Sequence, residues 1–160
     1  MTEIRRIKTG EWAALRDLRL RALEREPQAF CATRAEEARL TRSIWEERCR
    51  MGAESERTAT FVVAEGKHLL GMTVVKREEE RAEIYAVYLA EEARGRGLAS
   101  GMLELALAFA AGLPVWLEAN AALLPAERLY ARCGFRLDGT VRKFPDGRVM
   151  RGWVRHVPRV

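Results

Sequence analysis

The residues Arg94-Gly95-Arg96-Gly97-Leu98-Ala99 separate a strand-like apolar run, Ala82–Leu89, from a helix-like apolar run, Leu98–Ala111. A glycine turn that opens directly into a helix leaves several backbone N–H groups unpaired and pointing in one direction. The helix dipole adds partial positive charge there, and the two arginines of the turn add full charges. The turn is therefore typical of a phosphate-binding site.

Two common nucleotide-binding motifs do not fit this turn. A dinucleotide-binding fingerprint, G-x-G-x-x-G/A, would need Gly or Ala where the chain has Ser100. That fingerprint also belongs near the first strand of a parallel βαβ unit, whereas several expected antiparallel strands precede this turn. A P-loop needs a Gly-Lys-Ser/Thr ending, which the turn lacks.

Length and composition predict one globular domain that covers residues 1–160, since 48% of the residues are apolar. No apolar run approaches the ~20 residues of a membrane span, so we expect no membrane partner. The N-terminus lacks the apolar region of a signal peptide, which predicts a cytoplasmic protein. The net charge of +5 could attract nucleic acid, but arginines spread along the whole chain favour a compositional bias.

The cysteines do not form a recognisable motif. Cys31, Cys49 and Cys133 lie far apart in the sequence, and only His68 and His156 could join them as metal ligands. This set supports neither a zinc site nor a disulfide framework. We therefore expect no bound metal and expect the cysteines to fill the core.

Helical spacing of apolar residues and helix-ending residues predict about four helices. Pro27 ends the first helix, and the capping box Thr33-x-x-Glu36 begins one or two short helices that Gly52 stops. Gly134 is well placed to end the last helix. The expected helices after Pro27 cover residues 33–51, 98–111 and 125–133.

Between these helices, β-branched and apolar runs bounded by turn residues predict six to seven strands. They cover residues 3–7, 60–64, 68–75, 82–89, 115–120, 135–144 and 148–157. The second and third strands form a hairpin, as do the last two around Pro145-Asp146-Gly147. The fold class is therefore α/β (α+β): one mixed, mostly antiparallel sheet flanked by helices.

Three motifs carry a resemblance to a known family. Arg-x-x-Gly-x-Ala, from Arg94 to Ala99, resembles the acetyl-CoA pyrophosphate loop of the GNAT superfamily of N-acetyltransferases. The stretch 118–135 is similar to the family's later strand and helix, with their Leu-Tyr-x-x-x-Gly-Phe ending. Residues 18–23 with Pro27-x-Ala-Phe30 resemble the first helices of bacterial members. The resemblance covers nearly the whole chain and implies a single GNAT domain.

The resemblance implies acetyl-CoA as the acetyl donor and assigns residues to it. The backbone of Val87–Leu89 would bond to the pantetheine arm and the acetyl carbonyl, and a bulge in this strand would open a slot beside residues 115–120. Asn120 matches a family asparagine, but Leu123 stands where many members carry another cofactor-binding asparagine. The implied cofactor-binding residues are Val87, Tyr88, Leu89, Arg94, Gly95, Arg96, Gly97, Leu98, Ala99, Ser100 and Asn120.

The resemblance also implies the catalytic groups. Tyr130 stands where the family carries the acid that protonates the leaving CoA thiolate; its helix alone would predict a core tyrosine. Two carboxylates, Glu83 and Glu118, occupy positions where different members carry the base that takes a proton from the amine. The sequence leaves open which of the two acts, and whether a water intervenes.

The implied reaction is direct attack by an amine-bearing acceptor substrate on acetyl-CoA. We expect the acceptor site to be shaped by residues 24–35, 52–59 and 144–148, and the arginines favour an acceptor with a carboxylate or phosphate. The last hairpin could support a homodimer. Two alternatives stay open: a GNAT-fold protein that binds acetyl-CoA without catalysis, and a basic nucleic-acid-binding module.

Overall fold

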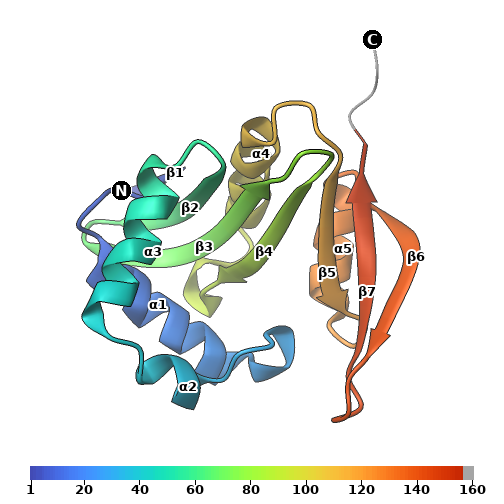
Figure 1. Cartoon of the computed structure of the whole chain (residues 1–160), viewed down its shortest axis with the longest axis horizontal. Coiled ribbons are helices and arrows are strands. Elements are labelled where there is room, and N and C mark those ends of the chain that lie inside the picture. The colour runs from blue at the N-terminus through green and yellow to red at the C-terminus, as the bar shows by residue number, and fades with distance from the viewer. Residues whose placement is uncertain (157–160) are drawn as a thin grey trace.

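A computed structural model describes residues 1–156, in which seven strands form one sheet. The order across the sheet is β1-β2-β3-β4-β5-β7-β6, so β7 lies between β5 and β6 (Figure 1). Every neighbouring pair is antiparallel except β4 and β5, which are parallel. The strands are β1 (Thr2–Arg6), β2 (Thr58–Glu65), β3 (His68–Arg77), β4 (Ala82–Leu89), β5 (Val115–Asn120), β6 (Arg136–Lys143) and β7 (Val149–Arg155).

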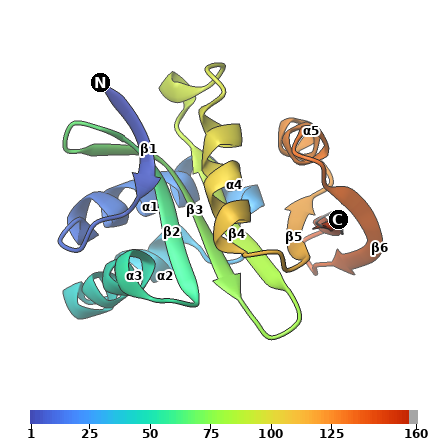
Figure 2. The ribbon, with the colours of Figure 1, turned by 90° about the horizontal axis from the view of Figure 1, so that it is seen from above.

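Helices cover both faces of this sheet, as Figure 2 shows from above. Helices α1 to α3 lie on one face of strands β1 to β4, α4 lies on the other face, and α5 lies beside β5. The α-helices are α1 (Trp12–Arg25), α2 (Arg34–Ala38), α3 (Arg42–Glu54), α4 (Leu98–Phe109) and α5 (Leu124–Arg132). Two short 3₁₀ turns are η1 (Pro27–Ala29) and η2 (Glu91–Ala93). The predicted fold class is confirmed.

The central strands are apolar on both sides because each face of the sheet packs against helices. In β2, Phe61 belongs to the core beneath α4 and its neighbour Val62 to the core beneath α1 and α3. Leu103 of α4 and Leu18 of α1 are both buried in these two cores. Successive side chains of a strand point to opposite faces of the sheet, so one strand contributes to two separate hydrophobic cores.

The expected helix end at Gly52 is wrong. The helix α3 continues through Gly52 to Glu54, and the chain enters β2 at Thr58. A Cβ added at Gly52 would lie 2.4 Å from Oγ1 of Thr60 and 3.2 Å from a methyl group of Ile7. Glycine is therefore present to let α3 approach the sheet closely, and it does not serve as a helix stop.

Other local expectations are confirmed at their capping residues. Thr33 caps α2, with its Oγ1 accepting a hydrogen bond from the N–H of Glu36 at 3.2 Å. Gly134 follows α5 with a φ of 88°. Both predicted hairpins form, β2 with β3 and β6 with β7. The last strand was expected to reach residue 157, which lies outside the described residues, as do residues 158–160 of the expected domain.

Candidate active site

A bulge in β4 opens the sheet at its centre. Ala86 and Val87 together lie opposite Thr73 of β3, and Ala86 has a φ of 57°. Pairing between β4 and β5 stops at Ile84 and Leu117, and the two strands then diverge, as Figure 1 shows. The bulge and the slot that were predicted beside residues 115–120 are confirmed.

The diverging part of β4 turns backbone N–H groups toward the slot. The N–H of Ala90 donates to the carbonyl of Leu70 on β3 at 2.7 Å. Because hydrogen bonds alternate along an antiparallel pair, the N–H groups of Leu89 and Val87 face the opposite edge, toward the slot. An extended amide-bearing chain could pair with this edge as an added strand. The role proposed for Val87–Leu89 is therefore hydrogen bonding by their backbone groups. The Tyr88 side chain is not needed for that role and packs in the core.

The glycine turn precedes α4, as predicted, with Gly97 as the N-cap residue. Gly95 and Gly97 have φ angles of 82° and 74°, and a Cβ at either would meet no atom within 4 Å. The two glycines therefore serve backbone conformation and leave open space before the helix N-terminus. Nε of Arg94 donates to the carbonyl of Leu89 at 3.0 Å, and the same side chain forms an ion pair with Glu26. Arg94 thus ties the turn to the end of β4.

A cavity of about 430 Å³ lies between this turn, α5 and β4. It brings together most of the predicted cofactor-binding residues. Arg96 does not line it, since its side chain lies at a separate surface hollow with Arg21 and Lys67. The predicted residues that line the cavity are Val87, Tyr88, Leu89, Arg94, Gly95, Gly97, Leu98, Ala99 and Ser100.

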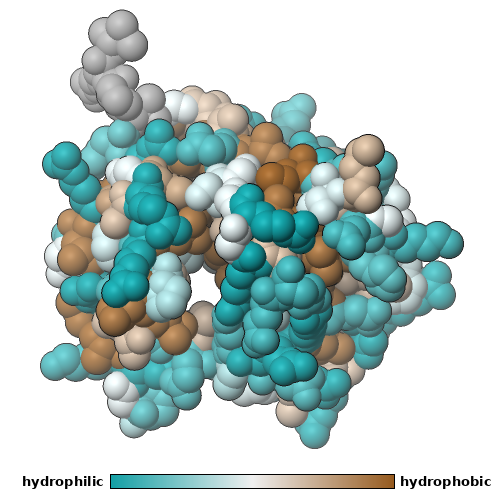
Figure 3. Space-filling view, turned by 180° about the vertical axis from the view of Figure 1, so that it is seen from behind, coloured by the Kyte–Doolittle hydropathy of each residue, from teal (hydrophilic) through white to brown (hydrophobic). Residues whose placement is uncertain are grey.

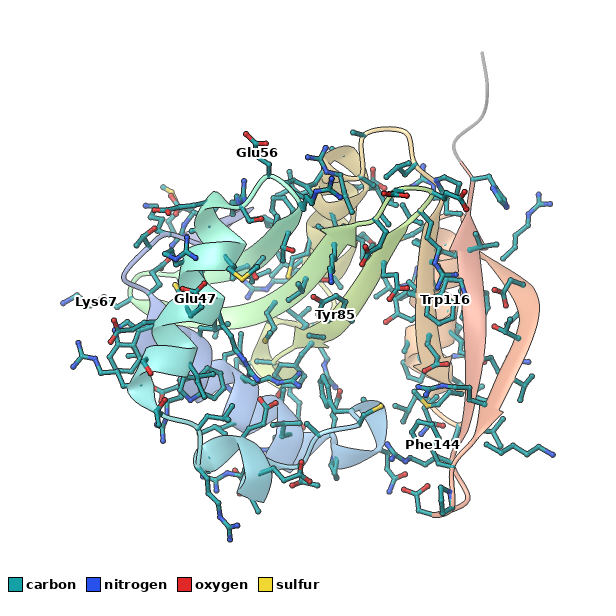
Figure 4. All side chains as sticks on the ribbon, in the orientation of Figure 1. Glu47, Glu56, Lys67, Tyr85, Trp116 and Phe144 are labelled. Atoms are coloured by element: carbon teal, nitrogen blue, oxygen red, sulfur yellow. The ribbon has the colours of Figure 1, made fainter. Side chains whose placement is uncertain are left out.

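A second cavity, of about 770 Å³, lies between β4, β5 and the η1 segment. Glu83, Tyr85 and Trp116 line it, and in Figure 4 Tyr85 and Trp116 stand on the two strands that border the opening. The two cavities share Glu26, Val87, Leu123, Ala126 and Tyr130. Figure 3 shows from behind that the surface is hollowed between the part that carries β5 to β7 and the rest of the chain.

Tyr130 stands where the two cavities meet, on α5. The residue is only 6% exposed, and its ring packs edge-on against Phe135. Burial raises the pKa of Tyr130 well above its ordinary value, and the negative charge of Glu26 adds to the shift. Its hydroxyl is therefore protonated at neutral pH, and within residues 1–156 no hydrogen bond contributes to its pKa. The hydroxyl is free to donate a proton to a bound molecule.

The two candidate bases line the second cavity from facing strands. Glu83 of β4 accepts a hydrogen bond from Arg81 at 2.9 Å. Glu118 of β5 is more enclosed, with a side chain 15% exposed, and accepts one from Nε of Arg142 at 2.8 Å. Glu83 pairs in register with Trp116, and strand alternation places Glu118 on the same side of the sheet. Both carboxylates thus face the same cavity.

Asn120 lies at the second cavity rather than at the turn. Its Nδ2 donates to the carbonyl of Gln28 and its Oδ1 accepts from the N–H of Ala122, both at 2.9 Å. The side chain therefore joins the end of β5 to η1, and its direct contact with a cofactor stays a prediction. Leu123, which replaces a family asparagine, lines both cavities and supplies an apolar wall there.

The expected acceptor-site segments are only partly at the second cavity. Residues 29–32, within the expected segment 24–35, line it. Neither the 52–59 segment nor the 144–148 turn lines it; Arg148 instead donates to the carbonyl of Phe30 at 2.7 Å. Arg19 lines the cavity from α1 and was not predicted. Its signal in the sequence was a charged residue on the otherwise apolar face that Leu15 and Leu23 define.

Neither a metal site nor a membrane span is found in residues 1–156. No group of three or more His, Cys, Asp and Glu side chains in this part of the chain could hold a metal ion. None of its helices is long and apolar enough to cross a bilayer.

Residues 12–135 match the model of the acetyltransferase (GNAT) family, and the chain belongs to this family. A segment of 88 residues is 32% identical to an uncharacterized N-acetyltransferase of Mycobacterium bovis. This match covers 52% of the chain and 56% of that protein, so the chain spans about half the length of the curated relative.

Solved structures show the same fold. A GNAT acetyltransferase from Streptococcus pneumoniae superposes with a TM-score of 0.83 at 18% identity, covering 99% of this chain and 100% of that one. The ribosomal L7/L12 α-N-protein acetyltransferase RimL, solved in complex with coenzyme A, gives a TM-score of 0.78 at 15% identity, covering 98% and 94%. The resemblance to the GNAT family that the motifs predicted is confirmed.

Proposed function

We propose that the protein transfers the acetyl group of acetyl-CoA to a primary amine in a ternary complex. The observation that carries the proposal is the position of Tyr130, which lines both cavities where they meet. One cavity lies against the glycine turn and would hold the donor; the other lies beside two carboxylates and would hold the acceptor. Family membership and the coenzyme A complex of the RimL neighbour support acetyl-CoA as the donor.

The donor would be bound largely by backbone. Its pyrophosphate would accept hydrogen bonds from the N–H groups at the start of α4, where the helix dipole favours negative charge. Its pantetheine amides would pair with the free edge of β4. The N–H groups of Val87 and Leu89 face the slot, so one of them would hold the acetyl oxygen as it gains charge during attack.

The acceptor amine must first lose a proton, because an alkylamine with a pKa of about 10 is mostly charged at neutral pH. Glu83 or Glu118 would take it, directly or through a water. The amine nitrogen then attacks the thioester carbon, and the tetrahedral adduct collapses with cleavage of the C–S bond. Tyr130 donates its proton to the departing thiolate, and the nitrogen gives up its remaining extra proton to restore the Tyr130 hydroxyl, so that free CoA and the neutral N-acetyl product leave.

The cysteines support direct transfer over a covalent acyl-enzyme. Cys31 is exposed and lines the second cavity, so the expectation that it fills the core is wrong, but no histidine among residues 1–156 lines that cavity to act as its base. Burial raises the pKa of Cys49 and of Cys133, which disfavours the thiolate at both.

The proposal is tested by measuring CoA release from acetyl-CoA across a panel of amines, from amino acids and polyamines to peptide N-termini. We expect release with at least one class of amine and saturable binding of acetyl-CoA by calorimetry. Tight acetyl-CoA binding without release from any amine would favour a non-catalytic binder instead. Titration with duplex DNA over a salt series tests the nucleic-acid alternative, for which we expect no specific binding.

We also infer that β6 is the surface on which two copies could pair. It is one of the two edge strands of the sheet and is exposed along its whole length, with Leu137 and Val141 46% and 54% exposed. An uncovered edge strand with apolar side chains favours pairing with another strand. Sedimentation analysis with and without charged substitutions at these two residues tests the dimer. The cytoplasmic location stays a prediction.

A further inference from the structure

A third cavity, of about 350 Å³, lies between α1, α3 and the sheet. It lies beside the second cavity, which would hold the acceptor and is called the acceptor cavity below. It shares Arg19, Tyr85 and Ala86 with that cavity, so the two are neighbours across the β4 bulge. Figure 4 shows Tyr85 between α3 and the opening beside β5. The side chains lining the third cavity are mainly apolar, such as those of Trp45 and Met72, together with those of three cations.

Two of these cations share a single carboxylate. Glu37 of α2 is only 7% exposed, and its Oε1 accepts hydrogen bonds from Nε of Arg19 and from Nη1 of Arg48, both at 3.0 Å. The third cation, Lys76, has its own partner in Glu78 at 3.3 Å. Within the described residues, two guanidinium groups thus face one carboxylate, which leaves one positive charge in excess.

The acceptor cavity differs in its charge balance. Glu83 pairs with Arg81 and Glu118 with Arg142, one carboxylate to one guanidinium in each case. The excess positive charge therefore lies at the third cavity. Arg19 lines both the second and the third cavity, so it lies at the boundary between them.

Two buried donors at this cavity have no partner within residues 1–156. They are Nη1 of Arg19 and Nε1 of Trp45, a residue that is 1% exposed. A buried N–H without an acceptor costs about 1–3 kcal/mol, and more when it is charged. Both side chains line the same cavity, and an oxygen acceptor bound there would satisfy them. Access requires a shift of the side chains around them, among which Tyr85 is 46% exposed and Arg48 42%.

We propose that the third cavity binds the carboxylate and the apolar side chain of the acceptor, which is a small amino-acid-like amine. Arg19, Arg48 and Nε1 of Trp45 hold the carboxylate, the Trp45 ring and Met72 border the apolar group, and the amine points past Ala86 into the second cavity. A guanidinium pair suits a carboxylate because each presents N–H donors in a planar fork. This inference rests on the proposed function and specifies its substrate class.

L-phenylalanine and L-phenylalaninamide test the role of the carboxylate, since they share the amine and the ring. We expect the wild-type protein to prefer L-phenylalanine in kcat/KM. Arg48→Gln should reduce this preference about tenfold or more, the effect of losing one charge-assisted hydrogen bond. Trp45→Phe, which keeps an aromatic ring but removes Nε1, should reduce it severalfold. Arg50→Gln, on the same helix but paired with Glu47 outside the cavity, should leave it unchanged.

Equal losses for both substrates in Arg48→Gln would assign the residue a structural role and overturn the inference. So would a wild-type protein that uses the amide as well as the acid. Calorimetric titration with L-phenylalanine and its amide, with and without CoA, measures the affinity of the cavity for each compound independently of acetyl transfer. Release of CoA from neutral amines, with neither binding nor turnover of L-phenylalanine, would overturn this inference and leave the proposed function standing.

Discussion

Gly97→Ala should weaken acetyl-CoA binding more than its effect on stability explains. Gly97 has a φ of 74° and a ψ of 10° at the N-cap of α4, and a Cβ there would meet no atom within 4 Å. The cost to the fold is therefore that of left-handed backbone alone, about 1–2 kcal/mol for a residue with a Cβ. A turn that shifts to relieve this strain displaces the N–H groups that would bind phosphate, so we expect affinity to fall about tenfold, or 1.4 kcal/mol.

Gly112→Ala is the matched control, because Gly112 follows the other end of the same helix. Its φ is 89°, and a Cβ there would likewise meet no atom within 4 Å. Both variants should lose about 1–2 kcal/mol in the free energy of unfolding, measured by denaturant titration. Only Gly97→Ala should lose acetyl-CoA affinity, measured by calorimetry. Unchanged affinity in Gly97→Ala, or equal losses in both variants, would refute the assignment of the turn to the donor.

Three further predictions concern substitutions at single positions. Gly52→Ala should destabilise the fold by about 1–3 kcal/mol in denaturant titration, since its Cβ would lie 2.4 Å from the stiff side chain of Thr60; an unchanged midpoint would contradict the close packing. Burial raises the pKa of Glu37, but its two guanidinium partners outweigh this and hold it below the ordinary value, so this carboxylate adds stability that is lost as the pH falls below about 4.3. Glu37→Gln should therefore flatten the acid limb of a stability–pH curve, and an unchanged limb would show that the group does not contribute. Of Glu83→Gln and Glu118→Gln, one should lower kcat/KM about 100-fold at neutral pH; full activity in both would exclude either carboxylate as the base.

Local signals in the sequence predicted the parts of the fold that local physics decides. The hairpins, the cap at Thr33 and the glycine turn before Leu98 depend on residues within one or two turns of each other. Gly52 was misjudged because its role depends on Thr60 in the facing strand, which helix-ending rules do not consider. Likewise, nothing in the order of the strands indicated that β7 lies between β5 and β6.

In the candidate site, too, some features depend on residues close together in the sequence and others on residues far apart. The residues that the family resemblance assigned to the donor lie mostly in one continuous stretch that contains the turn, and nine of them line one cavity; their contact with the donor stays a prediction. The second and third cavities are bordered by segments far apart in the sequence, and the sharing of Glu37 by Arg19 and Arg48 exists only in three dimensions. Asn120 shows the converse, since its motif position suggested a ligand contact whereas its polar atoms bond to backbone groups.

We expect Tyr130 to protonate the leaving thiolate at the meeting point of the two cavities. Tyr130→Phe removes the hydroxyl and keeps the buried ring, so it isolates this step from packing. We expect kcat to fall about 100-fold while the dissociation constant of acetyl-CoA stays unchanged. Loss of acetyl-CoA affinity with unchanged turnover of the bound complex would contradict it.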